Sequence, residues 1–233
     1  AGLAYKLTQI LSLSRVVMDF AVARHNMVES QIRPNRVTDP YILEAIADLP
    51  REAFTPAALA EIAYVDEAIA IGAGRYMMEP MVLARLLQAA EVLEDDVALL
   101  VGCGSGYEAA ILSYLASTVV ALESDADLAT TASDIMADLG IDTVAVVEGD
   151  LGQGFARQAP YDVIVFNGAV AEIPAAISQQ LAEGGRLVAI VGVGPMGKAT
   201  LETKNNGVLS SRVVFDAGTP MLAGFEVTPT FSF

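Results

Sequence analysis

The chain has 233 residues, 54% of them hydrophobic, and its 29 acidic and 13 basic side chains give a formal net charge of −16. This length is sufficient to bury one sizeable core, so we expect a single main domain. A chain this acidic repels phosphate backbones and anionic lipid surfaces. We therefore expect neither nucleic acid nor a membrane as a partner.

Histidine and cysteine are scarce. The only histidine is His25, which we expect on the surface, and the only cysteine is Cys103. One histidine and one cysteine are too few for a histidine-based metal site or an internal disulfide, and His25 does not fit a Ser-His-Asp triad. We therefore expect no metal. A lone cysteine fits a reducing compartment, so we expect a cytoplasmic protein.

The N-terminal segment differs from the rest of the chain. Residues 3–23 have apolar side chains at helical spacing, which predicts an amphipathic helix. Lys6 and Arg15 interrupt the apolar run, so it lacks the pattern of a signal peptide. Three interpretations stay open: an arm that packs on the domain, a contact of a homodimer, or sequence upstream of a native start at Met18 or Met27.

From residue 97 onward, short apolar segments alternate with segments of helical periodicity. Strands are expected at 97–101, 118–122, 143–147, 161–166 and 186–192, and helices at 107–116, 125–139 and 172–181. Such alternation predicts a doubly wound α/β fold whose sheet is mostly parallel and has helices on both faces. Strands that are apolar almost throughout fit burial on both sides.

The end of the sheet has a different pattern. Asn206-Gly207 lies between the alternating runs 199–204 and 212–216, which is a strong hairpin signal. We therefore expect a seven-stranded sheet that ends in antiparallel strands. The expected organisation is an arm or extension at 1–26 and one domain at 27–233, with a helical cap at 27–94, a ligand-binding core at 95–195 and antiparallel strands at 196–233.

A glycine-rich turn joins the first core strand to the next helix. It comprises Gly102, Cys103, Gly104, Ser105, Gly106 and Tyr107. Glycines permit a tight turn and close approach of the backbone to a ligand, and the helix N-terminus offers free N–H groups. Such turns also occur for packing reasons, and we expect Cys103 to be a packing residue and not a nucleophile. The Gly-x-Gly-x-Gly spacing disfavours a nicotinamide-dependent oxidoreductase, and the lack of a Gly-Lys-Ser/Thr motif disfavours an NTPase.

Acidic residues follow the next two strands. Glu123 comes at the end of the second core strand, and Asp150 and Leu151 follow the third. The carboxyl ends of parallel strands meet at one edge of a sheet, where such folds bind ligands. Glu123 can accept hydrogen bonds from both ribose hydroxyls, Asp150 can accept from the amine of adenine, and the Leu151 N–H can donate to a ring nitrogen. The sequence therefore predicts an adenosine ligand, although either acid alone is equally consistent with a helix cap or a solvated loop.

From Met27 onward, the sequence resembles class I methyltransferases, and specifically the protein-L-isoaspartate O-methyltransferase family. The blocks that carry the resemblance are M-V-E-S-Q-I at 27–32, L-P-R-E-A-F-T-P at 49–56, A-Y-V-D at 63–66, I-G-A-G at 71–74, the glycine turn at 102–107, G-D at 149–150 and E-G-G at 183–185. The resemblance implies S-adenosylmethionine as cofactor and S-adenosylhomocysteine as product. It also implies methylation of an isoaspartyl carboxylate in a peptide or protein substrate, as a step of protein repair.

The resemblance also assigns roles within the cofactor site. Gly102, Gly104 and Gly106 would line the methionine end of the cofactor. Glu123 would hold the ribose, and Asp150 with Leu151 would contact the adenine.

The substrate side departs from the family pattern. Where the family reads Q-T-I-S-Q-P, this chain has Arg75, Tyr76, Met77, Met78, Glu79 and Pro80, so that Met78 stands at the serine position. The family's C-terminal V-P-L element is not clear in residues 219–222. Arg75 could pair an anionic substrate and Tyr76 could stack or hydrogen-bond, or Tyr76, Met77 and Met78 simply pack over the cofactor.

Three interpretations of the altered pocket stay open. The chain is an isoaspartyl enzyme that tolerates the changes, a methyltransferase for another acceptor such as a small acid or phenol, or a catalytically silent homologue that keeps the fold and the cofactor.

Overall fold

The computed structural model describes residues 18–192 and 196–226. Most of the helix expected at 3–23 lies outside these residues. Within them, α2 spans Phe20–Met27, and Asp19 caps it by accepting hydrogen bonds from the Ala21 and Val22 N–H groups. His25 is exposed, as expected.

Short helices and one small hairpin make up the segment before the central sheet. After α2 come the turns η1 (Val28–Ile32) and η2 (Arg33–Asn35), α3 (Pro40–Asp48), η3 (Arg51–Phe54), η4 (Ala57–Ile62), β1 (Ile69–Gly72), β2 (Arg75–Met77) and α4 (Pro80–Ala90). The expectation of a mostly helical segment is correct for α3 and α4. It missed β1 and β2, which pair antiparallel through Ile69–Met77 and Ala70–Tyr76.

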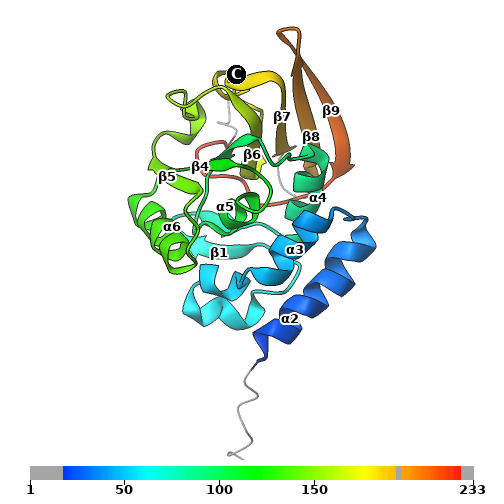
Figure 1. The fold of residues 1–233 in the computed structure, drawn as a ribbon, viewed down its shortest axis with the longest axis vertical. Coiled ribbons are helices and arrows are strands. Elements are labelled where there is room, and N and C mark those ends of the chain that lie inside the picture. The colour runs from blue at the N-terminus through cyan, green and yellow to red at the C-terminus, as the bar shows by residue number, and fades with distance from the viewer. Residues whose placement is uncertain (1–17, 193–195, 227–233) are drawn as a thin grey trace, which may run out of the picture.

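The central sheet has seven strands in the order β5-β4-β3-β6-β7-β8-β9. Their bounds are β3 Val97–Val101, β4 Thr118–Glu123, β5 Val144–Glu148, β6 Tyr161–Val170, β7 Leu181–Val191, β8 Lys198–Asn205 and β9 Val208–Asp216. β3 to β7 pair in parallel, and β8 and β9 add antiparallel at one edge. The predicted doubly wound fold with antiparallel C-terminal strands is confirmed (Figure 1).

The helices between the strands are shorter than the sequence predicted. They are α5 (Tyr107–Leu112), α6 (Ala126–Asp138) and α7 (Ala175–Ser178), with a single 3-10 turn, η5 (Leu151–Gln153), after β5. The helix expected at 172–181 is reduced to four residues because β7 already begins at Leu181, where the Tyr161 N–H donates to the Gln180 carbonyl. β6 is correspondingly longer than the expected 161–166.

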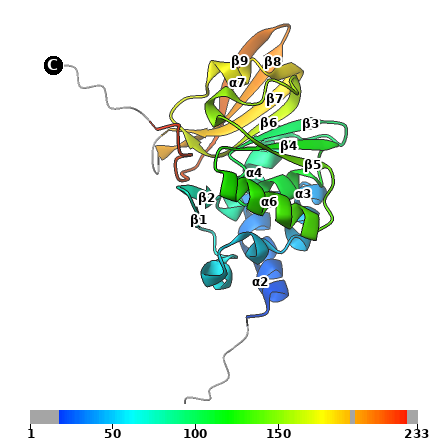
Figure 2. The same ribbon diagram turned by 90° about the vertical axis from the view of Figure 1, so that its left-hand side faces the viewer.

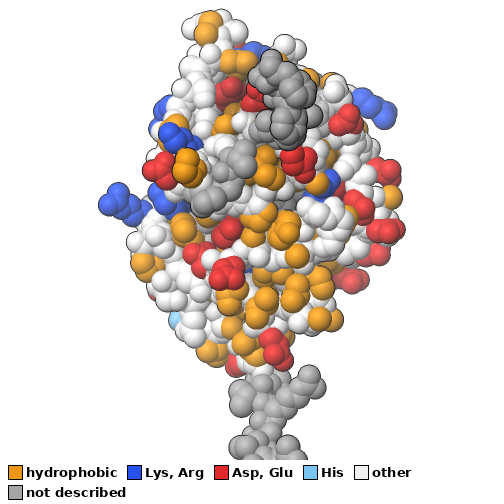
Figure 3. Space-filling model, turned by 180° about the vertical axis from the view of Figure 1, so that it is seen from behind, with side chains coloured by type: hydrophobic (Ala, Val, Ile, Leu, Met, Phe, Trp, Pro, Cys, Tyr) orange, Lys and Arg blue, Asp and Glu red, His pale blue; other side chains and the backbone are white. Residues whose placement is uncertain are grey.

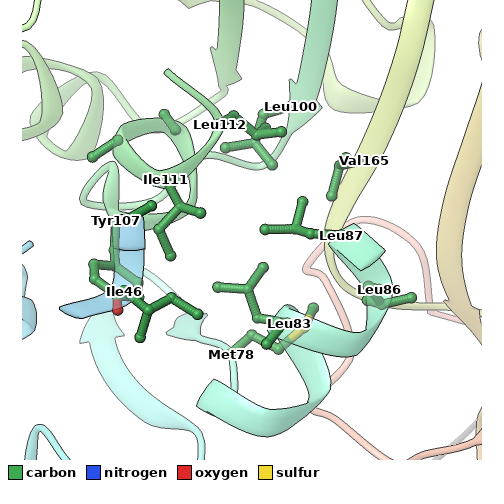
Figure 4. Packing of buried hydrophobic residues seen from close by; sticks show 14 of the residues in the cluster. Ile46, Met78, Leu83, Leu86, Leu87, Leu100, Tyr107, Ile111, Leu112 and Val165 are labelled. Atoms are coloured by element: carbon green, nitrogen blue, oxygen red, sulfur yellow. The ribbon is translucent and has the colours of Figure 1, made fainter. Parts of the chain in front are cut away.

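The two faces of the sheet are covered unequally. Because side chains alternate along a strand, Leu100 of β3 packs into one core while Leu99 and Val101 pack into the other. The larger core contains residues of α3, α4, α5 and α6, whereas α7 and η5 cover the opposite face. Figure 2 shows α3, α4 and α6 together on one side of the sheet. Figure 4 shows Leu100, Leu112, Val165 and Leu87 pointing toward one another in the larger core.

Hydrophobic side chains gather on the lower half of the face shown in Figure 3, with acidic side chains around them. Among the residues that the structure describes, no helix has both the length and the apolar character that crossing a bilayer would require.

Candidate functional site

The glycine turn, Glu123 and Asp150 lie at the same edge of the sheet. β4 stands between β3 and β5, so its carboxyl end is next to those of both neighbours. The Gly102 N–H donates to the Leu122 carbonyl at 2.9 Å, and the Gly149 N–H donates to the Glu123 carbonyl at 2.9 Å. The structure thus brings together the three turns that the sequence pointed to.

The turn itself has the backbone of a ligand-binding loop. Gly102, Gly104 and Gly106 have φ angles of 81°, 56° and 98°, which only glycine adopts readily. Cys103 between them is fully buried, and burial raises the pKa of its thiol, as expected of a packing residue. Gly106 also lets α5 approach α6, because a Cβ there would lie 3.2 Å from the Ala132 Cβ.

Glu123 is fully buried and turned toward the glycine turn. Its Oε2 accepts a hydrogen bond from the Gly104 N–H at 2.9 Å. Its Oε1 accepts from the N–H groups of Ser124 at 2.8 Å and Asp125 at 3.1 Å. These three backbone donors stabilise a carboxylate that is removed from water.

Arg75 completes the surroundings of Glu123. The Arg75 Nε donates to Glu123 Oε1 at 3.1 Å, and Arg75 Nη2 lies 3.1 Å from the same oxygen. Nη2 also donates to the Ser124 hydroxyl at 2.7 Å. The sequence placed Arg75 among the substrate-pocket candidates, whereas the structure brings it to the residue expected to hold a ribose.

Two apolar side chains lie against the glycine turn. A Cβ built on Gly104 would lie 2.6 Å from the Ile71 Cδ1, and one built on Gly102 would lie 2.6 Å from the Leu222 Cδ1. Leu222 is fixed by its N–H, which donates to the Ala169 carbonyl at 2.8 Å. Ile71 and Leu222 thus pack closely against the glycine turn, while the Arg75 guanidinium lies against Glu123.

Only a narrow hollow remains beside these side chains. Its volume is about 10 Å³, and it lies between residues 74–78 and 219–222. Pockets for small molecules usually hold about 300–1,000 Å³. The polar groups of the site suit an adenosyl group, but in this conformation the carboxylate expected to hold its ribose is paired with Arg75.

Asp150 and Leu151 lie at the next strand end. Asp150 is exposed, and its Oδ1 accepts from the Gly152 N–H at 2.9 Å, which caps the turn η5. Leu151 is buried against the smaller core. The cap is the structural role that the sequence already allowed for this acid, and contact with adenine stays a prediction.

The segment at 75–78 alternates in burial. Tyr76 is 40% exposed, whereas Met77 and Met78 are almost fully buried. The Met78 N–H donates to Glu108 Oε1 at 3.2 Å, and its carbonyl accepts from Arg51 Nη2 at 2.7 Å. The backbone N–H and the carbonyl of Met78 are thus both held by buried charged residues, and Figure 4 shows the Met78 side chain beside Leu83.

Sequence reasoning missed the polar residues beneath the site. Glu108 is fully buried; its burial raises the pKa of the carboxyl, and the Arg51 guanidinium opposes part of that shift. Asn167 donates from Nδ2 to the Gly102 carbonyl at 3.0 Å. Among the described residues, Asn167 Oδ1 and the hydroxyls of Ser105 and Tyr107 are buried without a hydrogen-bond partner. Glu108 is the one charged residue in the apolar run Tyr107–Leu112, and this was the one feature of the sequence that could have indicated a buried carboxyl.

The architecture and the three converging turns define a class I methyltransferase fold. In agreement, the structure resembles a solved protein-L-isoaspartate O-methyltransferase with a TM-score of 0.74 and 25% identity, covering 86% of this chain and 66% of that one. A second solved structure, from Plasmodium falciparum and titled a putative enzyme of the same name in complex with S-adenosyl-L-homocysteine, has a TM-score of 0.73 and 20% identity, covering 85% of this chain and 97% of that one.

Sequence comparison gives the particular family. The model of the protein-L-isoaspartate(D-aspartate) O-methyltransferase family matches residues 23–216. Proteins named protein-L-isoaspartate O-methyltransferase from Koribacter versatilis and Methanoculleus marisnigri are each 41% identical, over 74% and 72% of this chain and 78% and 77% of their own lengths. The chain belongs to this family, which confirms the resemblance found in its motifs.

Proposed function

We propose that this chain is an S-adenosylmethionine-dependent O-methyltransferase that methylates the carboxylate of isoaspartyl residues in peptides or proteins, a reaction of protein repair. Family membership supports the reaction. One observation carries the cofactor assignment. The Glu123 carboxylate accepts a hydrogen bond from the Gly104 N–H at the carboxyl edge of a parallel sheet.

The chain's own residues would divide the binding work. The backbone of Gly102, Gly104 and Gly106 would face the methionine end, Glu123 would accept from the ribose hydroxyls, and Asp150 with the Leu151 N–H would contact the adenine. When bound, S-adenosylmethionine supplies a methyl group activated by a sulfonium. The ribose assignment requires that Arg75 move away from Glu123.

The protein need not supply a general base. A carboxylate acceptor is already ionised at neutral pH, so orientation of the acceptor and exclusion of water are the main requirements. The exposed position of His25, far along the chain from the glycine turn, therefore poses no difficulty. Met77 and Met78 would keep water from the acceptor side, because both are almost fully buried.

The pairing of Arg75 with Glu123 favours one second candidate, a homologue that keeps the fold and has lost turnover. Calorimetry with S-adenosylmethionine and S-adenosylhomocysteine separates the two, followed by methyl transfer to an isoaspartyl peptide with the aspartyl peptide of the same sequence as control. Binding with transfer to the isoaspartyl peptide alone supports the proposal. Binding without transfer points to a different acceptor or a silent homologue.

Three expectations from the sequence remain proposals of the same kind. They are a cytoplasmic location, a homodimer, and the division of the chain at residues 26 and 95. α2 crosses the first of these boundaries, and its Phe20 and Met27 pack against the larger core. This contact supports an arm that packs on the domain.

A further inference from the structure

The Arg75–Glu123 pair leaves no room for a ribose at this carboxylate. Arg75 is 6% exposed and Glu123 is 0% exposed. Oε1 receives the Arg75 guanidinium together with two backbone N–H groups, and Oε2 receives the Gly104 N–H, with Arg75 Nε at 3.4 Å. A carboxylate has about four acceptor positions. The three backbone N–H groups leave about one of these positions, and Arg75 takes it, so a ribose hydroxyl can bind Glu123 only if Arg75 leaves.

The backbone that carries Arg75 is fixed more firmly than its side chain. Gly72 pairs with Arg75 across the β1–β2 hairpin, and the Met78 peptide is held by Glu108 and Arg51. The guanidinium, by contrast, has hydrogen-bond partners only in Glu123 and Ser124 among the described residues. Arg75 also lines the narrow hollow between residues 74–78 and 219–222.

Glu123 does not depend on Arg75 alone for hydrogen-bond donors. Three backbone N–H groups, from Gly104, Ser124 and Asp125, already hold its carboxylate. The arginine is therefore replaceable by another donor, and a ribose hydroxyl is a donor of the required kind.

We infer that Arg75 competes with the cofactor's ribose for Glu123, so that this arginine sets the cofactor affinity of the chain. The inference rests on the proposed function, because it assumes an adenosyl cofactor at this carboxylate. Binding must break a buried, forked ion pair before the ribose can engage, and this cost weakens the affinity.

Calorimetry with S-adenosylhomocysteine tests this competition in four proteins: wild type, Arg75→Gln, Glu123→Gln and the double variant. S-adenosylhomocysteine carries no net charge, so removal of a positive charge has little long-range effect on its affinity. We expect Arg75→Gln to bind about tenfold tighter or more, and the same change to alter binding less than about twofold when Glu123 is already glutamine.

Two further variants serve as controls. Arg33→Gln removes the same charge from an exposed arginine that pairs with Glu29 at 2.8 Å, and it should leave the affinity unchanged. Arg75→Lys keeps the charge and loses the fork, and it should bind with intermediate affinity. Arg75→Lys also keeps the test decisive where Arg75→Gln does not fold, as checked by circular dichroism.

The possible outcomes separate this inference from the proposed function. Equal or weaker binding by Arg75→Gln, or a gain that persists without Glu123, overturns the competition and leaves the enzyme assignment intact. A gain in affinity without methylation of an isoaspartyl peptide supports the competition and overturns the proposed function. No binding by any variant overturns both.

Discussion

Arg51 donates from Nη2 to the carbonyl oxygen of Met78 at 2.7 Å and fixes one end of the segment that carries the substrate-pocket candidates. Its Nε donates to the Ala63 carbonyl at 2.7 Å, and its guanidinium stacks over Tyr107 at 4.6 Å. Arg51 belongs to the L-P-R-E-A-F-T-P block, so the block connects three parts of the fold around one buried cation.

Arg51→Met should therefore destabilise the protein by about 3–5 kcal/mol, because it leaves buried carbonyls without donors and Glu108 without its cation. Urea unfolding at neutral pH measures this difference. Arg33→Met changes an exposed arginine in the same way and should cost less than about 0.5 kcal/mol. Equal losses for the two variants would show that the contacts of Arg51 add nothing to stability.

Met78→Ser tests whether the residue at the family's serine position limits isoaspartyl turnover. The Met78 side chain is almost fully buried, so its removal should cost about 2–4 kcal/mol in unfolding free energy. The new hydroxyl and added space should lower the KM for an isoaspartyl peptide. Met77→Ser is the matched control, because Met77 is equally buried but does not line the hollow. It should lose similar stability without the change in KM; an unchanged KM in Met78→Ser would mean that Met78 is not the sole block.

Glu108→Gln should change how stability depends on pH. Burial raises the carboxyl pKa in the folded state, so the folded protein binds this proton more tightly than the unfolded chain. The resulting stabilisation is present at pH values below the ordinary carboxyl pKa and is lost as the pH rises through the raised one. Glutamine can still accept from the Met78 N–H and does not titrate. Unfolding free energies between pH 4 and pH 8 (roughly the range in which a raised carboxyl titrates) should shift in favour of the variant as pH rises.

Glu29→Gln provides the background for this comparison, because Glu29 is an exposed member of an ion pair. If both variants show the same dependence on pH, Glu108 is not the group responsible.

Gly104→Ala tests the close approach to the glycine turn. The added Cβ would meet the Ile71 Cδ1 at 2.6 Å, and a φ of 56° adds about 1–2 kcal/mol of strain. Gly140→Ala has a φ of 69° with no atom within 4 Å, so it reports the strain alone. We expect the larger loss of thermal stability for Gly104→Ala, and a loss of S-adenosylhomocysteine affinity for this variant only. Comparable binding by both variants would argue that the turn does not contact the cofactor.

Patterns of neighbouring residues predicted the sheet well. Five apolar runs became parallel strands within one or two residues at most ends, and Asn206-Gly207 forms the expected hairpin turn with both φ angles positive. The hairpin β1–β2 was missed because its strands have only four and three residues. Too few positions exist there for alternation to stand out from a helical pattern.

The candidate site likewise has a part that the sequence predicted and a part that it did not. Glu123 and the glycine turn were found because strand ends converge by topology. Arg75 and Glu123 were both predicted as site residues, but Arg75 was assigned to the substrate pocket and Glu123 to the cofactor. Their contact joins residues 48 positions apart and depends on how the small hairpin lies over the sheet, which no local pattern encodes.

Leu222 reaches back across the molecule to Gly102 and Gly168, from a segment that follows the last strand. During translation, the glycine turn and Glu123 leave the ribosome well before this segment does. A growing chain can thus assemble β3 to β7 around a crevice that still faces water. The wall over Gly102 is added only when the chain beyond β9 docks, so the order of synthesis leaves closure of the crevice until late.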